Sequence, residues 1–453
     1  HIPDRIREGY GLNQTALEEL AGKGAKLIVS ADCGTSNIDE VFHARNLGLD
    51  VVILDHHSVP EKLPEAVATI NPKRDDSCYP ERELTAVGVA YKVMSALYEE
   101  MGRTLEQAHY LDLVALGTVA DVAPLLGENR ALVQKGLTTL AKSGRSGLRA
   151  LMKTASVPSD RVDAEMISFL LAPRLNAAGR LAHARLAFDL LVAKDEYTGF
   201  SMANQLHALN RERQRRQAAA LELAAELISS EDKESPLIFV GHESISLGIV
   251  GIVAGRIADE RYRPAFVYER GKNLSRASGR SIPEYDITSA LHTCGDILLR
   301  FGGHHQAAGF TAETSQLETL KERLQEHAAR ELESVQLSPT IEIDAALPLS
   351  EIQGEEIRWM ARLQPFGEGN PEPTFLSQGV LVADARRIGE DGSHLRLKLK
   401  DGPATWPAIA FRLGHMAPRP GESLDVIYSL AVDRSRENRL ELRVKDFSRS
   451  ASN

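Results

Sequence analysis

The sequence predicts an α/β protein with two sheet-containing domains, a long connecting helix and a C-terminal β-barrel. Short apolar runs alternate with helical stretches between Leu27 and Leu125, which is typical of a parallel sheet covered by helices on both faces. A single helical pattern extends from Asp195 to Ser229. After Glu331, several segments alternate apolar and polar residues, as half-buried antiparallel strands do.

The first sheet is predicted from two apolar runs and the helical patterns that follow them. The runs are "KLIVSADCG" and "DVVILDHH", and the helices are "SNIDEVFHARNLG" and "LTAVGVAYKVMSALYEEMG", the second of which ends at Gly102. Ligands of parallel sheets bind beyond the carboxyl ends of the strands. Asp32 and the triplet Asp55, His56 and His57 fall at those ends.

The predicted connecting helix is apolar toward both ends and basic in its centre. Arg213 and Arg216 interrupt an apolar stripe with helical spacing, formed by Met202, Leu206, Leu209, Ala220, Leu223 and Leu227. The central "NRERQRRQ" favours a solvated bridge between domains at least as much as a nucleic-acid contact.

A second α/β unit and the barrel follow the connecting helix. The unit is predicted from the strand "SPLIFVG", the helix "SLGIVGIVAGRIADER" and the strand "RPAFVYE". Gly248, Gly251 and Gly255 permit close packing of that helix, but they do not match a dinucleotide-binding fingerprint, whose glycines lie in the strand-to-helix turn. The barrel strands are predicted from "IEIDA", "HLRLKLK", "LDVIYSLAV" and "RLELRVKDF".

Composition limits the classes of function. The chain has 453 residues, a formal net charge of -10 and three cysteines without a CxxC pair, so neither a disulfide framework nor a thiolate zinc site is expected. No apolar run reaches the roughly 18 residues of a membrane span, and a cytoplasmic location without a membrane partner is predicted. A nucleic-acid partner requires a local basic groove, because the net charge repels polyanions.

Three acidic side chains and two histidines form a candidate metal site. A turn or a helix cap explains a lone aspartate at a strand end, but Asp32, Asp55, His56 and His57 at one sheet edge favour metal binding. Asp121 lies in the apolar run "LDLVALGTVADVAPL", where an unpaired charge is costly. Oxygen and imidazole ligands suit Mn²⁺ or Mg²⁺. The sequence has no G-x-S-x-G, HExxH or GxxxxGK[ST] motif that would indicate a competing chemistry.

These motifs resemble those of a known family. "ADCGTSNIDEV", "LDHHSVP" and "GTVADVAPL" look like motifs II, III and IV of the DHH phosphoesterases. The segments "IPDRIREGYGLN", "LAPRLNAAGR", "SGRSIPEYDI", "GGHHQAAGF" and "LQPFGEGNPEPTF" resemble the RecJ-type exonucleases of that family along essentially the whole chain. The resemblance implies a DHH domain (1–155), a helical connector (156–230), a DHHA1 domain (231–335) and an OB-like nucleic-acid-binding domain (336–453).

The resemblance also implies roles for the residues of the metal site. Asp32 would bridge two metal ions, and His56 and Asp121 would ligate the second. His57 would contact the scissile phosphate, and Asp55 would orient the histidine pair.

Two further groups of residues are implied to bind DNA. Ser278, Arg280, Gly302, Gly303 and His304 would hold the 5′-terminal phosphate and its nucleotide, and Arg174, Asn176 and Arg180 would line a DNA groove. Taken alone, "GGHH" favours a tight turn with a surface histidine pair, and Arg174 and Arg180 could form ordinary surface ion pairs.

The predicted barrel has a basic face. Arg396, Lys398 and Lys400 alternate with leucines, and Arg443 and Lys445 follow the same pattern. A solvated sheet face explains this charge, and so does an OB-fold that binds single strands.

The function that the resemblance implies is a single-stranded-DNA-specific 5′→3′ exonuclease of DNA repair and recombination that uses a two-metal mechanism. Single-strand-binding protein and a RecQ-type helicase are implied partners. The alternatives are a phosphodiesterase of short oligonucleotides or cyclic dinucleotides, and a non-catalytic single-strand-binding scaffold. The family's motif I, a DxDxDG-type stretch with two metal-binding aspartates, is absent from the sequence as given. We therefore expect weak metal binding and low activity, and we attribute the absence to truncation.

Overall fold

The structure is a computed structural model that describes residues 1–5, 8–228, 235–389, 391–433 and 439–450. The chain forms two compact units: residues 1–123 with 135–339, and residues 124–134 with 340–453. The predicted domain boundary between residues 230 and 231 lies outside the described residues, and the four-part division stays a prediction. In the described ranges, no helix has both the length and the apolar character needed to cross a membrane.

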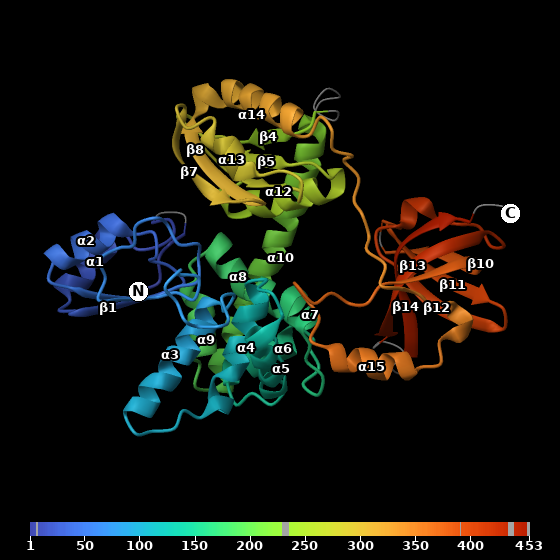
Figure 1. Cartoon of the computed structure of the whole chain (residues 1–453), viewed down its shortest axis with the longest axis horizontal. Helices are drawn as coiled ribbons and strands as arrows, with labels where there is room; N and C mark the ends of the chain where they lie inside the picture. The colour runs from blue at the N-terminus through green and yellow to red at the C-terminus, as the bar shows by residue number, and fades with distance from the viewer. Residues whose placement is uncertain (6–7, 229–234, 390, 434–438, 451–453) are drawn as a thin grey trace. The chain divides into compact units, whose positions relative to one another are not determined.

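The N-terminal part contains a three-stranded parallel sheet in the order β1-β2-β3 (Figure 1). Its elements are α1 (Gln14–Gly22), β1 (Leu27–Ala31), α2 (Ile38–Asn46), β2 (Asp50–Leu54), β3 (Ala68–Ile70) and α3 (Ala86–Glu100). The predicted strands and helices of this region are confirmed. One face of the sheet packs against α1 and α2 through a core that includes Ile28, Val51 and Ile53.

The expectation that helices cover both faces of this sheet is wrong for β1. Burial alternates along β1, so Ile28 and Ser30 are buried whereas Leu27 and Val29 are 54% and 55% exposed. The reason is that β1 is an edge strand with a period of two. Helices α1 and α2 pack on the Ile28 side, and α3 also contacts β1, but Leu27 and Val29 stay more than half exposed.

Helices follow the first sheet. They are α4 (Leu111–Ala120), α5 (Gly127–Ala141), α6 (Ser146–Thr154), α7 (Ala164–Met166), the π-helical turn η2 (Ile167–Leu171), α8 (Ala172–Leu181), α9 (Arg185–Leu191) and α10 (Glu196–Leu227). The Asp195 side chain caps α10 by accepting a hydrogen bond from the Thr198 backbone N–H. Helix α10 packs against α6, α8 and α9, and also against α12 (Leu247–Arg261) and β4 (Ile238–His242). The predicted connecting helix is therefore confirmed.

The second sheet is mixed, in the order β4-β5-β6-β8-β7. Its further elements are β5 (Ala265–Glu269), β6 (Leu274–Arg280), α13 (Ile287–His292), β7 (Leu298–His304), β8 (Ala307–Glu313) and α14 (Leu317–Glu331). β4 and β5 pair in parallel as predicted, and the pairs β5–β6, β6–β8 and β7–β8 are antiparallel. The sequence analysis missed β6, β7 and β8 because glycine, alanine and serine weaken their strand pattern.

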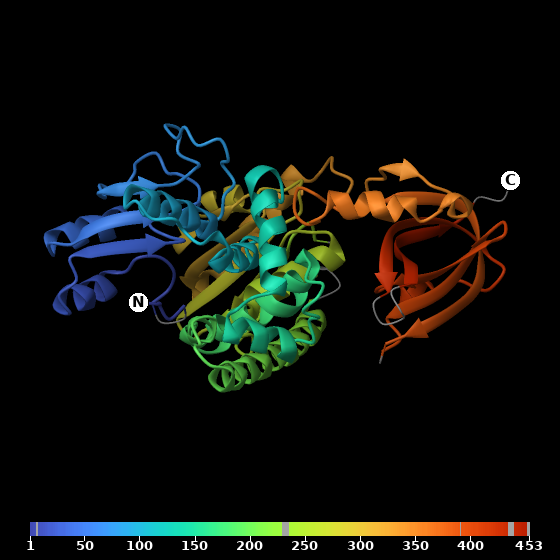
Figure 2. The ribbon, with the colours of Figure 1, turned by 90° about the horizontal axis from the view of Figure 1, so that it is seen from below.

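The C-terminal unit contains a closed five-stranded barrel (Figure 2). Its elements are β9 (Ala345–Ala346), α15 (Glu355–Leu363), β10 (Phe375–Ile388), β11 (His394–Asp401), β12 (Ala404–Ala410), β13 (Ser423–Asp433) and β14 (Arg439–Arg449). β10 pairs with both β11 and β13, and β12 pairs with β14, which closes the ring. The prediction of a strand at "IEIDA" is wrong except for Ala345, which begins the two-residue β9.

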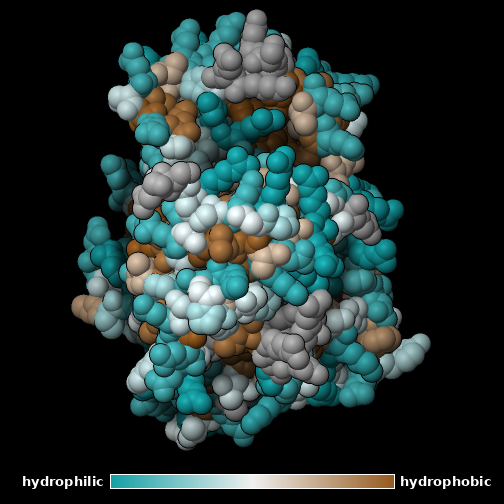
Figure 3. All heavy atoms as spheres, turned by 90° about the vertical axis from the view of Figure 1, so that its right-hand side faces the viewer, coloured by the Kyte–Doolittle hydropathy of each residue, from teal (hydrophilic) through white to brown (hydrophobic). Residues whose placement is uncertain are grey.

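Short 3-10 turns connect some elements: η1 (Gln107–His109), η3 (Thr314–Gln316), η4 (Leu349–Glu351) and η5 (Gly414–Met416). In the face of the molecule seen in Figure 3, hydrophilic side chains predominate and hydrophobic residues form small separate patches. Such a surface is ordinary for a folded protein in water.

Residues 124–134 belong to the C-terminal unit although they follow α4 in the chain. The Leu125 N–H donates to the Glu368 carbonyl (2.7 Å), and Arg130 Nη2 donates to the Leu363 carbonyl (2.7 Å). Segment 363–370, which includes the "PFGEGN" stretch, therefore holds the residues immediately after α4.

Helix α6 lies unusually close to its neighbours because of two glycines. A Cβ on Gly147 would lie 1.7 Å from the Leu190 carbonyl oxygen of α9. A Cβ on Gly199 of α10 would lie 3.2 Å from the Gly147 Cα. The packing of α6 against α9 and α10 therefore has no room for a methyl group at Gly147.

We predict that Gly147→Ala lowers the free energy of unfolding by about 3 kcal/mol, because the backbone of α9 must move away from α6. Gly144→Ala is the matched control, since a Cβ there meets nothing within 4 Å. Urea unfolding of the two variants and the parent measures the effect. Equal midpoints for both variants would contradict the close packing.

Candidate functional site

The carboxyl ends of β1 and β2 bring the first candidate residues together. The parallel register pairs Ala31 with Leu54, so the next residues, Asp32 and Asp55, meet at one edge of the sheet. The Asp32 N–H donates to the Leu54 carbonyl (2.9 Å). Asp32 has φ 65°, a left-handed conformation that aspartate tolerates better than most residues. The chain therefore turns sharply where the carboxylate is presented.

Two of the predicted metal ligands, Asp32 and Asp121, converge on the imidazole of a third, His56. His56 Nε2 lies 3.1 Å from Asp32 Oδ1 and 3.5 Å from Asp121 Oδ2. One ligand atom each from Asp32, His56 and His57 lies within 4.8 Å of the others. This set of carboxylate and imidazole donors fits a divalent ion such as Mn²⁺ or Mg²⁺.

Asp121 follows the last residue of α4 and is 46% exposed, so it does not lie inside the apolar run as its sequence surroundings suggested. Partial burial raises the pKa of its carboxyl; the His56 ring opposes this effect, and the like charge of Asp32 adds to it. A cation among these groups would offset the repulsion between the two carboxylates.

Asp55 is buried beneath the histidine pair. Its Oδ1 accepts from His57 Nδ1 (2.7 Å) and from the His56 backbone N–H (2.8 Å), and its Oδ2 accepts from the Thr35 N–H (3.0 Å). Burial raises the pKa of Asp55, but these hydrogen bonds outweigh it and hold the pKa far below its ordinary value. The same His57–Asp55 hydrogen bond raises the pKa of His57.

Asn71 is a site residue that the sequence analysis missed. It is buried just beyond β3, and its Nδ2 donates to the His57 carbonyl (2.9 Å) and to Thr35 Oγ1 (3.1 Å). Its Oδ1 accepts from the Lys73 N–H (2.9 Å). The signal for Asn71 was a polar residue directly after the third parallel strand, as at Asp32 and Asp55.

A second group of predicted residues lies in the mixed sheet. Arg280 Nη1 donates to Ser278 Oγ (3.0 Å), and both residues belong to β6. Gly251 of α12 faces them: a Cβ there would lie 3.1 Å from Ser278 Oγ and 3.3 Å from Arg280 Nη2. The serine hydroxyl and the arginine guanidinium thus form a small cradle beside a helix surface that carries no side chain at Gly251, and these donors suit an anionic oxygen.

Arg180 adds positive charge beside this cradle. Its Nη1 donates to the Gly248 carbonyl of α12 (3.4 Å). Burial, together with the charges of Arg5, Arg213 and Arg280, lowers the pKa of Arg180 to about 10. Several guanidinium groups that repel one another in a partly buried place favour an anionic ligand.

Arg5, Tyr10 and Arg213 were not predicted as site residues. Arg5 lies over the Tyr10 ring at 4.6 Å from its centroid, and both act on the pKa of Arg280. Arg213 Nε donates to the buried Asn210 (3.1 Å). Arg5 and Tyr10 lie in the "IPDRIREGYGLN" segment, and Arg213 lies in the basic centre of α10. The sequence analysis did not decide whether that basic centre is solvated or contacts nucleic acid.

Gly302, Gly303 and His304 end strand β7, so the expectation of a tight turn at "GGHH" holds only beyond His304. Gly302 pairs with Gly309, which pairs with Ser278, and His304 is aligned with Arg280 through Ala307 in the same way. Two strand spacings, roughly 10 Å, separate these residues from the cradle. Gly302 and His304 are therefore aligned across the sheet with Ser278 and Arg280, but strand β8 lies between them.

The predicted groove residues lie on α8 with different surroundings. Arg174 Nε donates to His207 Nδ1 (3.3 Å), and Arg174 Nη1 donates to the Leu170 carbonyl (2.5 Å). Asn176 is exposed. The contacts of Arg174 are with uncharged acceptors, so the alternative of an ordinary surface ion pair is not supported for this residue.

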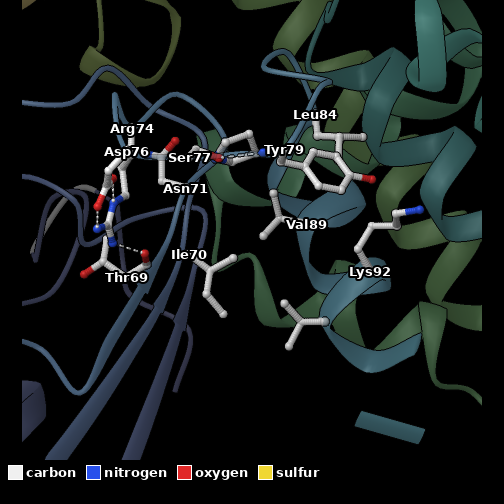
Figure 4. A pocket seen from close by; sticks show the side chains of 12 residues that line it. Thr69, Ile70, Asn71, Arg74, Asp76, Ser77, Tyr79, Leu84, Val89 and Lys92 are labelled. Atoms are coloured by element: carbon white, nitrogen blue, oxygen red, sulfur yellow. Dashed lines mark hydrogen bonds and ion pairs between the residues drawn. The ribbon is translucent and has the colours of Figure 1, made fainter. Parts of the chain in front are cut away.

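A pocket of about 290 Å³ lies between β3 and α3. One of its lining residues is Asn71, whose side chain donates to the His57 carbonyl. Ile70 and Asn71 line one wall and Tyr79, Val89 and Lys92 the other (Figure 4). None of the predicted site residues lines it.

Comparison with known proteins agrees with this organisation. Residues 1–118 match the DHH family N-terminal domain, residues 234–330 the DHHA1 domain and residues 343–446 the RecJ OB domain. The chain is 34% identical to the single-stranded-DNA-specific exonuclease RecJ of Bacillus subtilis over 98% of its own length, and it spans only 57% of that protein.

Two further relatives extend the comparison. The chain is 33% identical to Escherichia coli RecJ, covering 97% of this chain and 80% of that protein. The crystal structure of RecJ in complex with Mn²⁺ from Thermus thermophilus is similar over 97% of this chain and 64% of that one, with 32% identity and a TM-score of 0.83. The arrangement of DHH, DHHA1 and RecJ OB domains and these identities show that the chain belongs to the RecJ family.

Proposed function

We propose that this chain acts in the metal-dependent hydrolysis of single-stranded DNA from its 5′ end. The observation that carries the proposal is the convergence of Asp32 and Asp121 on His56 Nε2. The names of the relatives and the Mn²⁺ in the T. thermophilus structure support it.

Asp32, His56 and Asp121 would hold a Mn²⁺ or Mg²⁺ ion; a second ion stays a prediction. When bound, such an ion supplies Lewis-acid stabilisation of phosphate charge and acidifies water. His57 Nδ1 donates to Asp55, which leaves Nε2 turned toward a ligand. Because the pKa of His57 is raised, the protonated ring would donate a hydrogen bond from Nε2 to a phosphate oxygen. Asp55 is buried and acts through His57.

The cradle of Ser278, Arg280 and Gly251 would hold the 5′-terminal phosphate. Arg180 would add charge there, since Arg offers phosphate a paired set of donors. Arg174 and Asn176 on α8 would follow the strand as groove residues. Gly302, Gly303 and His304, two strands away, would contact the terminal nucleotide beyond its phosphate.

The barrel would bind the same strand farther from its end, through the basic face of Arg396, Lys398 and Lys400 with Arg443 and Lys445. A role in DNA repair and recombination, and the predicted partners single-strand-binding protein and a RecQ-type helicase, belong to this proposal.

We predict that Asp32→Asn and His56→Ala each weaken Mn²⁺ binding at least tenfold and abolish Mn²⁺-dependent release of nucleotides from 5′-labelled single-stranded DNA, because each change removes a ligand. Asp39→Asn on the exposed surface of α2 is the control. Titration calorimetry measures binding, and denaturing gels measure release. Unchanged Mn²⁺ affinity in both variants would sink the metal assignment, and release from dinucleotides alone would favour the short-oligonucleotide phosphodiesterase.

Gly251→Ala is expected to reduce the preference for a 5′-phosphorylated over a 5′-hydroxyl strand by roughly tenfold, because the added methyl group enters the cradle. Gly255→Ala is the matched control one turn along α12, where a Cβ meets only Arg280 Cγ at an ordinary 3.7 Å. Affinities for the two strands measure the preference. An equal preference in both variants would argue against a phosphate in the cradle.

Asp55→Asn is expected to lower the pKa of His57 toward the ordinary value of roughly 6.5, because the hydrogen bond from Nδ1 then ends on an uncharged oxygen. NMR titration of the metal-free chain measures this pKa. His43, whose Nε2 lies 3.0 Å from Glu18, provides an internal control. A His57 pKa that stays raised would show that Asp55 is not its cause.

A further inference from the structure

We propose that the barrel carries a stacking platform for one unpaired nucleobase, formed by His394 and Phe411. The two rings are 5.4 Å apart between centroids and inclined by 75°. Phe411 is 48% exposed, so part of its ring is open to a ligand. The inference rests on the proposed function and assigns a base contact to the barrel.

The barrel holds both rings in fixed positions. His394 begins β11 and Phe411 follows β12, next to the pair of Leu395 with Ala410. The Arg412 backbone N–H donates to His394 Nδ1 (3.0 Å), and the left-handed φ of 65° at Arg412 turns the chain to allow it. In this hydrogen bond Nδ1 is the acceptor, which fixes the orientation of the ring. A prearranged ring pair loses little entropy when a ligand stacks on it.

Positive charge continues from the platform along one face of β11. Side chains two residues apart point to the same side of a strand, so Arg396, Lys398 and Lys400 extend from His394 in a basic strip. Arg396 is paired with Arg386 on β10 and with Ile409 on β12. Because the whole chain has a formal net charge of -10, this strip is a local feature of the kind that a polyanion partner requires.

These features together select single-stranded nucleic acid. β11 and β12 are the second and third strands of the barrel, the surface that OB-folds use for oligonucleotides. Exposed aromatic faces bind bases of any sequence, and neighbouring cations follow the phosphates. The apolar area is small and flanked by Arg412, which does not suit a protein interface with a large hydrophobic core.

The test measures binding of a fluorescent thymidine 20-mer to the full chain by anisotropy. Phe411→Ala and Phe411→Leu are expected to weaken binding roughly tenfold, whereas Phe411→Trp retains it because an aromatic face is restored. Trp359→Ala is the matched control: Trp359 is an exposed aromatic of the same unit, but Arg362 already lies over its ring at 4.9 Å. Thermal unfolding should change little in all four variants, since neither side chain belongs to the buried core of the barrel.

Salt dependence separates stacking from phosphate contacts. Lys398→Ala is expected to reduce the slope of affinity against salt by about one, whereas Phe411→Ala weakens binding at every salt concentration without changing the slope. The affinity of the chain for a dinucleotide should be the same with and without the Phe411→Ala substitution. Wild-type affinity for the 20-mer in both Phe411→Ala and Phe411→Leu would overturn the platform, even if nucleotide release is normal. If the Phe411 variants bind the 20-mer more weakly but the parent chain releases no nucleotides, the platform stands and the proposed function is overturned.

Discussion

The buried carboxylate of Asp55 constrains the turn that Asp55, His56 and His57 form after β2. A carboxylate removed from water costs several kcal/mol unless donors surround it, and those donors are the Thr35 and His56 backbone N–H groups and the His57 ring. Each donor must therefore stay where Asp55 needs it. The turn after β2 has one arrangement as a result, and Asn71 fastens that arrangement to the third strand.

Two clusters of opposite charge result from the fold of the N-terminal unit. At the ends of β1, β2 and α4, carboxylates gather around His56 and favour a cation. At β6 and α12, guanidinium groups are partly buried near one another and favour an anion. In the proposed function, a terminal phosphodiester with its metal ion would supply both kinds of charge and would offset the repulsion within each cluster.

The sequence predicted the first sheet and its polar edge well, because long apolar runs in β1 and β2 end abruptly at Asp32 and Asp55. It did not predict β6 to β8, where glycine and alanine provide close packing but no periodic signal. The exposure of Leu27 and Val29 could not be predicted from the sequence either. An edge strand and a central strand have the same apolar pattern when the residues of both faces are apolar. Arg5 and Tyr10 were missed because their surroundings are set by residues distant in the chain. Asn71 followed the same rule as Asp32, but its strand is only three residues long.

The attachment of residues 124–134 to the C-terminal unit has a mechanical consequence. Asp121 is separated from Pro124 by two residues, and Leu125 is already hydrogen-bonded to Glu368. The C-terminal unit thus begins, with Pro124, only three residues after Asp121, which belongs to the other unit. A substitution that removes the Leu125–Glu368 hydrogen bond would therefore act within a few residues of a proposed metal ligand, although the bond itself lies inside the C-terminal unit.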